Sequence, residues 1–346
     1  MYNVLASIVF LLAGHTLGQI TTSCNPLERT CPDNPALSSK SYAHDFATGL
    51  DDSNWNITAG NVTSTSSGAH FIITKAGDAP TIRSKWYIFF GRVSFTLRSA
   101  PGTGIVSSAI LLSDDLDEFD WEFLGSESTT VQMNYFGEGK TTTTDRELDA
   151  TVSSNTQTNS HNYTLVWTET QTQWIIDGII MRTLTPSQAT SSGNSYPQSP
   201  MDVRIGIWAG GDSGNAEGTI EWAGGLTDYT QGPFEMVLEH VEVENYNPGY
   251  SYTYTDMSGD ADSIRVNLEG SSSSSRTSTA SGTASTVVSL QTKAATHSAT
   301  TTATGALVTG GANATAGVAP SLSGGAQVGM RGHCVLVVLG AMAALL

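Results

Sequence analysis

The sequence predicts an all-β protein, an antiparallel β-sandwich or jelly roll with a concave cleft, followed by a Ser/Thr-rich stalk without fixed structure. Its apolar residues come in short, alternating runs rich in β-branched and aromatic types, with turn signals between them. It also lacks a long amphipathic stretch with the 3.6-residue helical period. No internal repeat is evident, which argues against a propeller.

Six runs predict strands, at residues 70–74, 86–90, 93–97, 163–167, 174–177 and 203–208. Turn signals such as Pro101-Gly102, Asp177-Gly178 and Gly193-Asn194 separate runs of this kind. Residues 174–181 have apolar residues on both sides of Asp177-Gly178, which predicts a β-hairpin with a two-residue turn at these positions. Many short strands in one domain favour a sandwich.

Both ends of the chain have the composition of processing signals. Residues 1–18 contain a short apolar run followed by small residues, which predicts a secretory signal peptide cleaved near Gly18–Gln19. The apolar run 334–346 is shorter than the ~20 residues that span a bilayer, and small residues precede it. This pattern predicts a propeptide at 324–346 for glycosylphosphatidylinositol (GPI) attachment at Ser323 or Gly324.

Between these signals the composition changes near Glu269. Beyond it the chain has no acidic or aromatic residue, so residues 270–323 are expected to form a stalk, and residues 19–269 the folded domain. With Cys334 in the removed tail, Cys24 and Cys31 are expected to form a disulfide in an oxidising compartment. Four sequons fit the same secreted protein, at Asn56, Asn61, Asn162 and Asn313.

The formal net charge of -17 argues against nucleic acid as a partner. It also argues against a surface that adheres to anionic lipid. Trp and Tyr in an acidic, Gly/Ser/Thr-rich chain suit a neutral polymer such as a polysaccharide, whose rings offer apolar faces. No nucleotide-binding glycine loop or zinc motif is present, so we expect neither a cofactor nor a metal.

The stretch 113–125 carries the chemistry. If residues 118–122 form a strand, Glu118, Asp120 and Glu122 point to one face and the aromatic residues that alternate with them point to the other. At about 5.5 Å and an effective dielectric constant of about 20, two such carboxylates repel by roughly 3 kcal/mol, which favours protonation of one. Paired carboxylates of this kind act as acid and nucleophile in glycosidases. A solvated acidic strand or a cation site are the alternatives.

Residues 118–122, Glu-Phe-Asp-Trp-Glu, match the E-x-D-x-E signature of glycoside hydrolase family 16. The stretch 113–125, followed by residues 134–136, resembles the fungal chitin–glucan cross-linking transglycosylases of the Crh branch, as do the paired cysteines, stalk and GPI-like tail. Phe119 departs from the commoner aliphatic residue. The resemblance implies a jelly roll and a retaining mechanism, with Glu118 as nucleophile, Asp120 as its assistant and Glu122 as acid/base.

Further residues are expected to bind the sugar chain. In the strand 203–208, Arg204 and Trp208 share a face with Gly206, so Arg204 would donate to hydroxyls and Trp208 would stack on a pyranose ring. A second short strand is expected at 219–222. The remaining candidate substrate-binding residues are Thr219, Trp222, Gln132, Asn134 and Tyr135.

Three functions remain open. The first is a cell-wall transglycosylase that transfers a chitin donor to a β-glucan or chitin acceptor; the choice of these polymers is implied by the resemblance alone. The second is an endo-hydrolase of chitin or β-glucan with the same carboxylates, and the third a non-catalytic carbohydrate-binding wall protein. Residues 211–214, Gly-Asp-Ser-Gly, resemble a serine-protease loop without a matching histidine. We expect a secreted monomer, GPI-anchored to the plasma membrane or cell wall.

Overall fold

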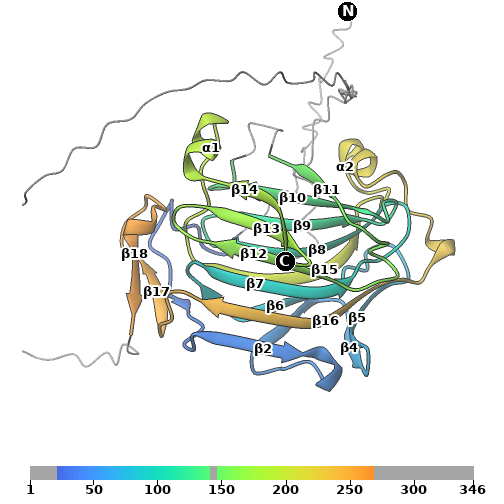
Figure 1. The fold of residues 1–346 in the computed structure, drawn as a ribbon, viewed down its shortest axis with the longest axis horizontal. Coiled ribbons are helices and arrows are strands. Elements are labelled where there is room, and N and C mark those ends of the chain that lie inside the picture. Colours follow the sequence, from blue (N-terminus) through green and yellow to red (C-terminus); the bar gives the residue numbers. More distant parts are fainter. Residues whose placement is uncertain (1–21, 141–145, 269–346) are drawn as a thin grey trace, which may run out of the picture. The chain divides into compact units, whose positions relative to one another are not determined.

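The computed structural model describes residues 22–140 and 146–268. The expected signal peptide, stalk and GPI propeptide, with Asn313, Ser323 and Gly324, lie outside the described residues. Within them, the strands form two large antiparallel sheets that face one another, and a small third sheet (Figure 1). The predicted antiparallel β-sandwich is confirmed.

The first large sheet has seven strands and carries the acidic motif. Its strand order is β11-β10-β9-β8-β15-β6-β3. The bounds are β11 (Leu148–Thr151), β10 (Thr130–Phe136), β9 (Glu118–Leu124), β8 (Ile105–Ser113), β15 (Met201–Ala209), β6 (Thr81–Ile88) and β3 (Trp55–Ala59).

The second large sheet has eight strands and backs the first. Its order is β14-β13-β12-β7-β16-β5-β4, and β2 also pairs with β16. The bounds are β14 (Ile179–Leu184), β13 (Thr172–Ile176), β12 (His161–Trp167), β7 (Gly91–Arg98), β16 (Phe234–Asn245), β5 (Gly68–Ile73), β4 (Val62–Thr65) and β2 (Ser41–Asp45).

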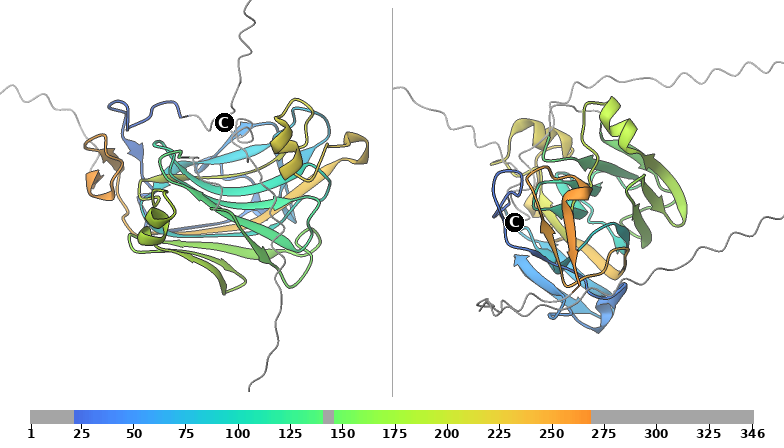
Figure 2. Two further views of the ribbon diagram at one scale, coloured as in Figure 1. Left: turned by 90° about the horizontal axis from the view of Figure 1, so that it is seen from above. Right: turned by 90° about the vertical axis from the view of Figure 1, so that its left-hand side faces the viewer.

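Shorter elements lie around the two layers (Figure 2). A three-stranded sheet joins β1 (Asn34–Pro35), β17 (Ser251–Tyr254) and β18 (Ile264–Asn267). The helices are α1 (Pro186–Ser191) and α2 (Glu217–Trp222), with 3-10 turns η1 (Phe46–Thr48), η2 (Tyr229–Gln231) and η3 (Ala261–Ser263). No helix in the described part of the chain is long and apolar enough to cross a membrane.

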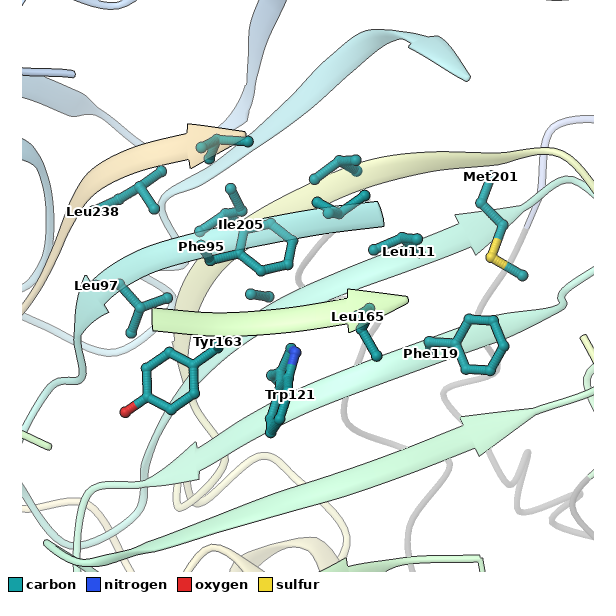
Figure 3. Packing of buried hydrophobic residues seen from close by; sticks show 14 of the residues in the cluster. Phe95, Leu97, Leu111, Phe119, Trp121, Tyr163, Leu165, Met201, Ile205 and Leu238 are labelled. Atoms are coloured by element: carbon teal, nitrogen blue, oxygen red, sulfur yellow. The ribbon is translucent and has the colours of Figure 1, made fainter. Parts of the chain in front are cut away.

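The core lies between the two large sheets. Every second residue of β9 points into it, so that Phe119 and Trp121 pack toward Tyr163 and Leu165 of β12 (Figure 3). The rings of Trp121 and Tyr163 lie 5.5 Å apart, and those of Phe119 and Trp174 also 5.5 Å. Aromatic pairs of this kind contribute about 0.5–1.5 kcal/mol each beyond the area they bury. The same alternation turns the carboxylates of β9 away from the core.

Most of the expected strands are present, with changed ends. The hairpin across Asp177-Gly178 is confirmed, since these two residues join β13 to β14 with φ of 49° and 81°. The expected strand at 219–222 is wrong, because these residues belong to α2. Ala216 precedes the helix in an extended conformation, and Gly224 and Gly225 follow it with positive φ. Short helices depend on tertiary packing, and α2 packs through Trp222 against Trp208. Cys24 and Cys31 form a disulfide, with Cα atoms 5.8 Å apart.

Candidate active site

The register of the seven-stranded sheet defines the neighbours of the three carboxylates. Directly opposed residues in antiparallel strands share a face, so each carboxylate has one partner on β10 and one on β8. The three rows are Phe136–Glu118–Leu112, Asn134–Asp120–Ile110 and Gln132–Glu122–Ser108. The structure therefore brings Gln132 and Asn134 beside the carboxylates, on the face directed away from the core.

All three carboxylates are buried. Glu118 and Asp120 are 0% exposed, and Glu122 is 5% exposed. Apart from a hydrogen bond that the two carboxyl groups share with each other, the carboxyl oxygens of Glu118 and Asp120 have no hydrogen-bond partner among the described residues. Buried polar groups without partners are rare and costly, and they concentrate at functional sites.

Burial raises the pKa of each of the three carboxyl groups. The pKa of Glu118 lies well above its usual value because of desolvation and then the charges of Asp120 and Glu122, while the charge of Arg204 opposes the shift. Desolvation raises the pKa of Asp120 to about 7, against the hydrogen bond with Glu118 and then the charge of Arg146. Desolvation, Asp120 and Glu147 raise the pKa of Glu122 well above its usual value.

This arrangement can run acid and base chemistry on one strand. Like-charged neighbours in a dry site cannot all ionise at neutral pH, so at least one carboxyl keeps a proton. A protonated carboxyl can donate to a leaving oxygen while an ionised neighbour attacks. Of the three, Glu122 is the one with residual exposure, which suits exchange of protons with an incoming group.

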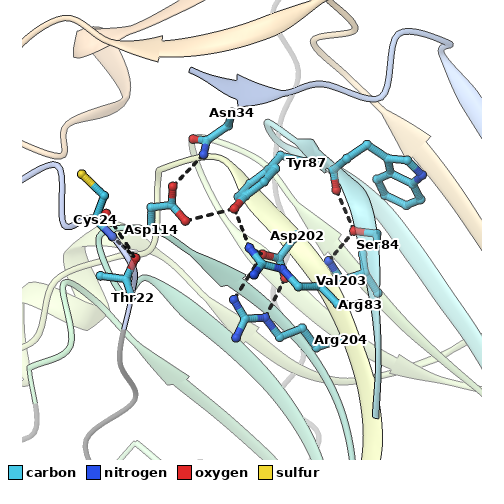
Figure 4. A network of polar contacts seen from close by, with 11 residues as sticks. Thr22, Cys24, Asn34, Arg83, Ser84, Tyr87, Asp114, Asp202, Val203 and Arg204 are labelled. Carbon is cyan, nitrogen blue, oxygen red and sulfur yellow. Dashed lines mark hydrogen bonds and ion pairs between the residues drawn. The ribbon is translucent and has the colours of Figure 1, made fainter. Parts of the chain in front are cut away.

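Arg204 lies on the same face but does not stand free for a sugar. Its Nε and Nη2 atoms donate to the two carboxylate oxygens of Asp202, at 2.8 and 3.2 Å. Arg83 of β6 binds the same carboxylate, with Nη2 2.6 Å from Oδ2 (Figure 4). The expected role of Arg204 as a donor to hydroxyls therefore competes with a tight internal ion pair.

Trp208 and Trp222 form an aromatic pair beside this row. Their rings are stacked, with centroids 6.1 Å apart and an interplanar angle of 21°. The indole Nε1 of Trp222 donates to Oε1 of Gln132, 3.0 Å away. Helix α2 also carries Thr219, which is 1% exposed and whose hydroxyl has no partner among the described residues. The structure thus joins Gln132, Trp208 and Trp222 in one cluster, which the sequence placed on separate strands.

Tyr135 is a correction to the expected substrate-binding set. It stands opposite Phe119, so it lies on the core face of β10 and is 2% exposed. The guanidinium of Arg182 lies 5.2 Å from the centre of its ring. The period of two that places Gln132 and Asn134 on the outer face necessarily turns Tyr135 inward.

Two further residues support the site and were not among the expected site residues. Asp202 lies two residues before Arg204 on β15 and therefore on the same face of the sheet, so the period of two that identified Arg204 also identifies Asp202. Trp174 of β13 donates from Nε1 to the backbone carbonyl of Asp120, 3.2 Å away. No pattern in the sequence links Trp174 to Asp120, because they lie in different sheets.

The sequons within the described residues lie on three different strands or turns. Asn56 on β3 and Asn61 in the turn after it are exposed. Asn162 on β12 is half-buried, and its Oδ1 accepts a hydrogen bond of 2.7 Å from Thr164. Within residues 22–140 and 146–268, no group of three or more His, Cys, Asp or Glu side chains is placed to hold a metal ion.

The comparisons with known proteins agree with this geometry. Residues 50–224 match the model for glycosyl hydrolases family 16. The chain belongs to glycosyl hydrolase family 16. Two curated relatives of this family 16 chain are similar to it over most of its length: Crh-like protein 5 of Aspergillus fumigatus, 50% identical over 71% of the chain, and Crh-like protein 2 of Botryotinia fuckeliana, 47% identical over 77%.

A solved structure is also similar to the family 16 chain. The Crh5 transglycosylase in complex with NAG is 51% identical, with a TM-score of 0.68, over 70% of this chain and 100% of that one. The chain spans about three fifths of the length of the two curated relatives, 62% and 60%. The resemblance to Crh-type family 16 proteins inferred from residues 113–136 is confirmed.

Proposed function

We propose that this family 16 protein is a retaining cell-wall transglycosylase that cleaves a β-1,4-linked chitin donor and transfers it to a β-glucan or chitin acceptor. The single observation that carries the proposal is the row of three buried carboxylates on the outer face of β9. Their position on one strand, backed by core aromatics, fixes them relative to one another. Polar residues of β10 stand beside them.

The proposed reaction has two steps. Glu118 attacks the anomeric carbon and Glu122 gives its proton to the leaving oxygen, so a glycosyl–Glu118 ester forms as the glycosidic bond breaks. Glu122, now ionised, takes the proton of an acceptor hydroxyl, whose oxygen displaces Glu118. Asp120 lies between the two glutamates on the strand, and its charge raises the pKa of both. The site returns to its first protonation state.

The donor is proposed from two observations. The similar Crh5 transglycosylase was solved with NAG bound, and chitin is the polymer of that sugar. The partly exposed Trp222, together with Gln132, offers ring surface and a polar group next to Glu122, which suits binding of pyranose units. Trp208 is 2% exposed and packs behind Trp222, so it supports this ring and does not itself present a surface to a sugar. Thr219 and Asn134 are proposed to complete the sugar-binding set.

The first experiment mixes the purified protein with chito-oligosaccharide and fluorescent β-glucan oligomers, and follows products by size and mass. Hybrid chitin–glucan products that disappear in Glu118→Gln support the transferase and its nucleophile together. Glu169→Gln is the matched control, because it makes the same change in an exposed turn. Shortened chitin without hybrids indicates an endo-hydrolase, and tight binding without products indicates a carbohydrate-binding wall protein.

A second experiment separates the two glutamates. A chito-oligosyl fluoride has a leaving group that needs little help from an acid, so Glu122→Gln retains the first step and loses base assistance in the second. We expect the glycosyl ester on Glu118 to accumulate and to appear as added mass on the intact protein. The absence of this species, with turnover unchanged, contradicts the assignment of Glu122.

We further propose that the protein is secreted as a GPI-anchored glycoprotein monomer, with residues 19–269 as its catalytic domain. The processing signals at both ends, the sequons at Asn56, Asn61, Asn162 and Asn313, and the disulfide support this. Release of the protein from membranes by phosphatidylinositol-specific phospholipase C, followed by mass mapping of the last peptide and the sequons, tests it. An anchor far from Ser323 and Gly324 would overturn the proposed site.

A further inference from the structure

Asp202 is the centre of a charged cluster on the face that carries the carboxylates. It is 0% exposed, and three nitrogen atoms from two arginines reach it. Arg204 uses both Nε and Nη2, and Arg83 uses Nη2, with distances of 2.8, 3.2 and 2.6 Å. A buried carboxylate shared by two guanidinium groups holds both in fixed positions, because Arg binds carboxylates through a rigid planar fork.

The register places this cluster next to the proposed nucleophile. Asp202 stands in the row of Glu118, with Leu112 between them, and Arg204 stands in the row of Asp120, with Ile110 between them. Two strand spacings put the Cα atoms of each pair about 10 Å apart. The side chains that separate them are apolar, so a long guanidinium can act across this gap with little screening by water.

We propose that Asp202 is a positioning residue that anchors the guanidinium of Arg204 at a fixed place beside Glu118, so that Arg204 acts on the nucleophile by its charge and not by a direct ion pair. This inference rests on the proposed function, because it assigns a role to Glu118. Arg83 completes the anchor as the second cation on Asp202.

The hydrogen bonds of the Arg204 guanidinium to Asp202 explain why Arg204 does not form an ion pair with Glu118. A nucleophile held in a two-bond ion pair with an arginine is a poor one. With Nε and Nη2 committed to Asp202, Arg204 contributes its charge to Glu118 without covering the attacking oxygen. The charge of Arg204 indeed opposes the upward shift in the pKa of Glu118.

Other charged groups near Glu118 must be considered with Arg204. On its own strand, Asp120 and Glu122 disfavour its ionisation. Its direct ladder partners, Leu112 and Phe136, are apolar. The remaining titratable or charged side chains on or near this face are Asp202 and Arg204 on β15, Arg83 and Tyr87 on β6, and Arg146 and Glu147 before β11.

The far end of the network offers a control. Arg83 donates from Nη2 to the hydroxyl of Tyr87 at 2.7 Å, Tyr87 donates to Asp114 at 3.0 Å, and Asn34 donates to Asp114 at 2.7 Å (Figure 4). Asp114→Asn removes one negative charge from the same network without touching Arg204. It therefore matches Asp202→Asn in chemistry and differs in position.

The test titrates the carboxyl of Glu118 in the full chain labelled with [δ-13C]glutamate, with the signal assigned by its loss in Glu118→Gln. We expect Arg204→Met to raise the midpoint by about half to one pH unit, because a nearby opposite charge is lost. Asp202→Asn should raise it as well, because the guanidinium of Arg204 loses its anchor and leaves its place near Glu118, which outweighs the loss of the charge of Asp202. The double variant should shift no further than either single one, because both changes remove the same interaction. Asp114→Asn should leave the midpoint in place.

The sign of the shift decides the outcome. If Asp202 acts only as a negative charge, its removal lowers the midpoint, and the inference is overturned. If Asp202→Asn does not fold, Arg204→Met carries the test, because Asp202 then keeps Arg83 as its partner; an unchanged midpoint in this variant overturns the inference. In Arg204→Lys the midpoint of Glu118 should lie between the wild-type value and that of Arg204→Met, because lysine keeps the positive charge. The titration needs no substrate, so a wild-type protein that titrates as expected but makes no hybrid products contradicts the proposed function alone.

Discussion

The indole nitrogen of Trp174 donates a hydrogen bond to the backbone carbonyl of Asp120, with 3.2 Å between the two atoms. Trp174 lies on β13 of the eight-stranded sheet and Asp120 on β9 of the seven-stranded sheet, so this bond crosses the core. Trp174 is 0% exposed, and the guanidinium of Arg182 lies 4.7 Å from its ring centre. The backbone at Asp120, the middle residue of the three carboxylates, is thus held in place from the core side.

Trp174→Phe tests this support. Phenylalanine keeps most of the ring contact with Phe119 but cannot donate to Asp120. We expect a loss of about 1–3 kcal/mol in the free energy of unfolding, because a buried hydrogen bond is lost, and a decrease in kcat larger than the change in KM. Urea unfolding and steady-state transfer kinetics measure both. Trp55→Phe, in a buried tryptophan of the edge strand β3, is the control that should lose stability while its kcat is retained.

Asp120→Asn should make the protein more stable at neutral pH and less active. The pKa of Asp120 is raised from 3.8 to about 7 in the fold, so the folded state binds the proton more tightly than the unfolded state. The resulting cost is absent below about pH 4, grows as the pH rises toward 7 and is complete above it. We expect Asn to gain roughly 2–4 kcal/mol at pH 8 and little at pH 4.

Denaturant unfolding of Asp120→Asn and wild type at pH 4, 6 and 8 checks this dependence. Asp52→Asn is the control, because Asp52 is an exposed carboxylate on a turn. A gain in stability that does not depend on pH would contradict a raised pKa at Asp120. The fall in activity of Asp120→Asn is measured in the same transfer assay.

Trp222 should affect binding more than chemistry. Trp222→Phe keeps the stacking with Trp208 but loses the hydrogen bond to Gln132, whereas Trp222→Ala loses both. We expect KM for the donor to rise at most a few-fold in the first variant and up to about 10-fold in the second, since stacking on an aromatic ring contributes about 0.5–1.5 kcal/mol. Donor kinetics measure the two effects. A fall in kcat at unchanged KM would place Trp222 in the chemical step.

The disulfide should matter for stability and little for transfer. Cys24 and Cys31 are 7 residues apart, and a loop this short constrains the unfolded chain by about 2–3 kcal/mol at most. The double variant Cys24→Ser, Cys31→Ser should therefore unfold a few degrees lower and keep its kcat/KM. Calorimetry and the transfer assay check both. A large loss of transfer would connect the N-terminal loop to the site.

Alternation within a strand is a local property, so the sequence by itself determined the carboxylate face of β9. Each residue of a strand points opposite to its neighbours, and Glu118, Asp120 and Glu122 therefore share a face in any fold that makes them a strand. The same local rule predicted the hairpin at Asp177-Gly178. It also turns Tyr135 inward beside Gln132 and Asn134, so the expectation that Tyr135 binds sugar was inconsistent with the alternation.

The tertiary structure alone decided which separate segments meet. Asp202 with Arg83, Trp208 with Trp222, and Trp174 with Asp120 are joined across strands, a helix and two sheets, by a register that depends on the whole core. Residues 217–222 became a helix because they lie between turns, outside the ladder of either sheet. Local sequence fixes the direction of a side chain within its strand, whereas its partner is chosen by packing between distant segments.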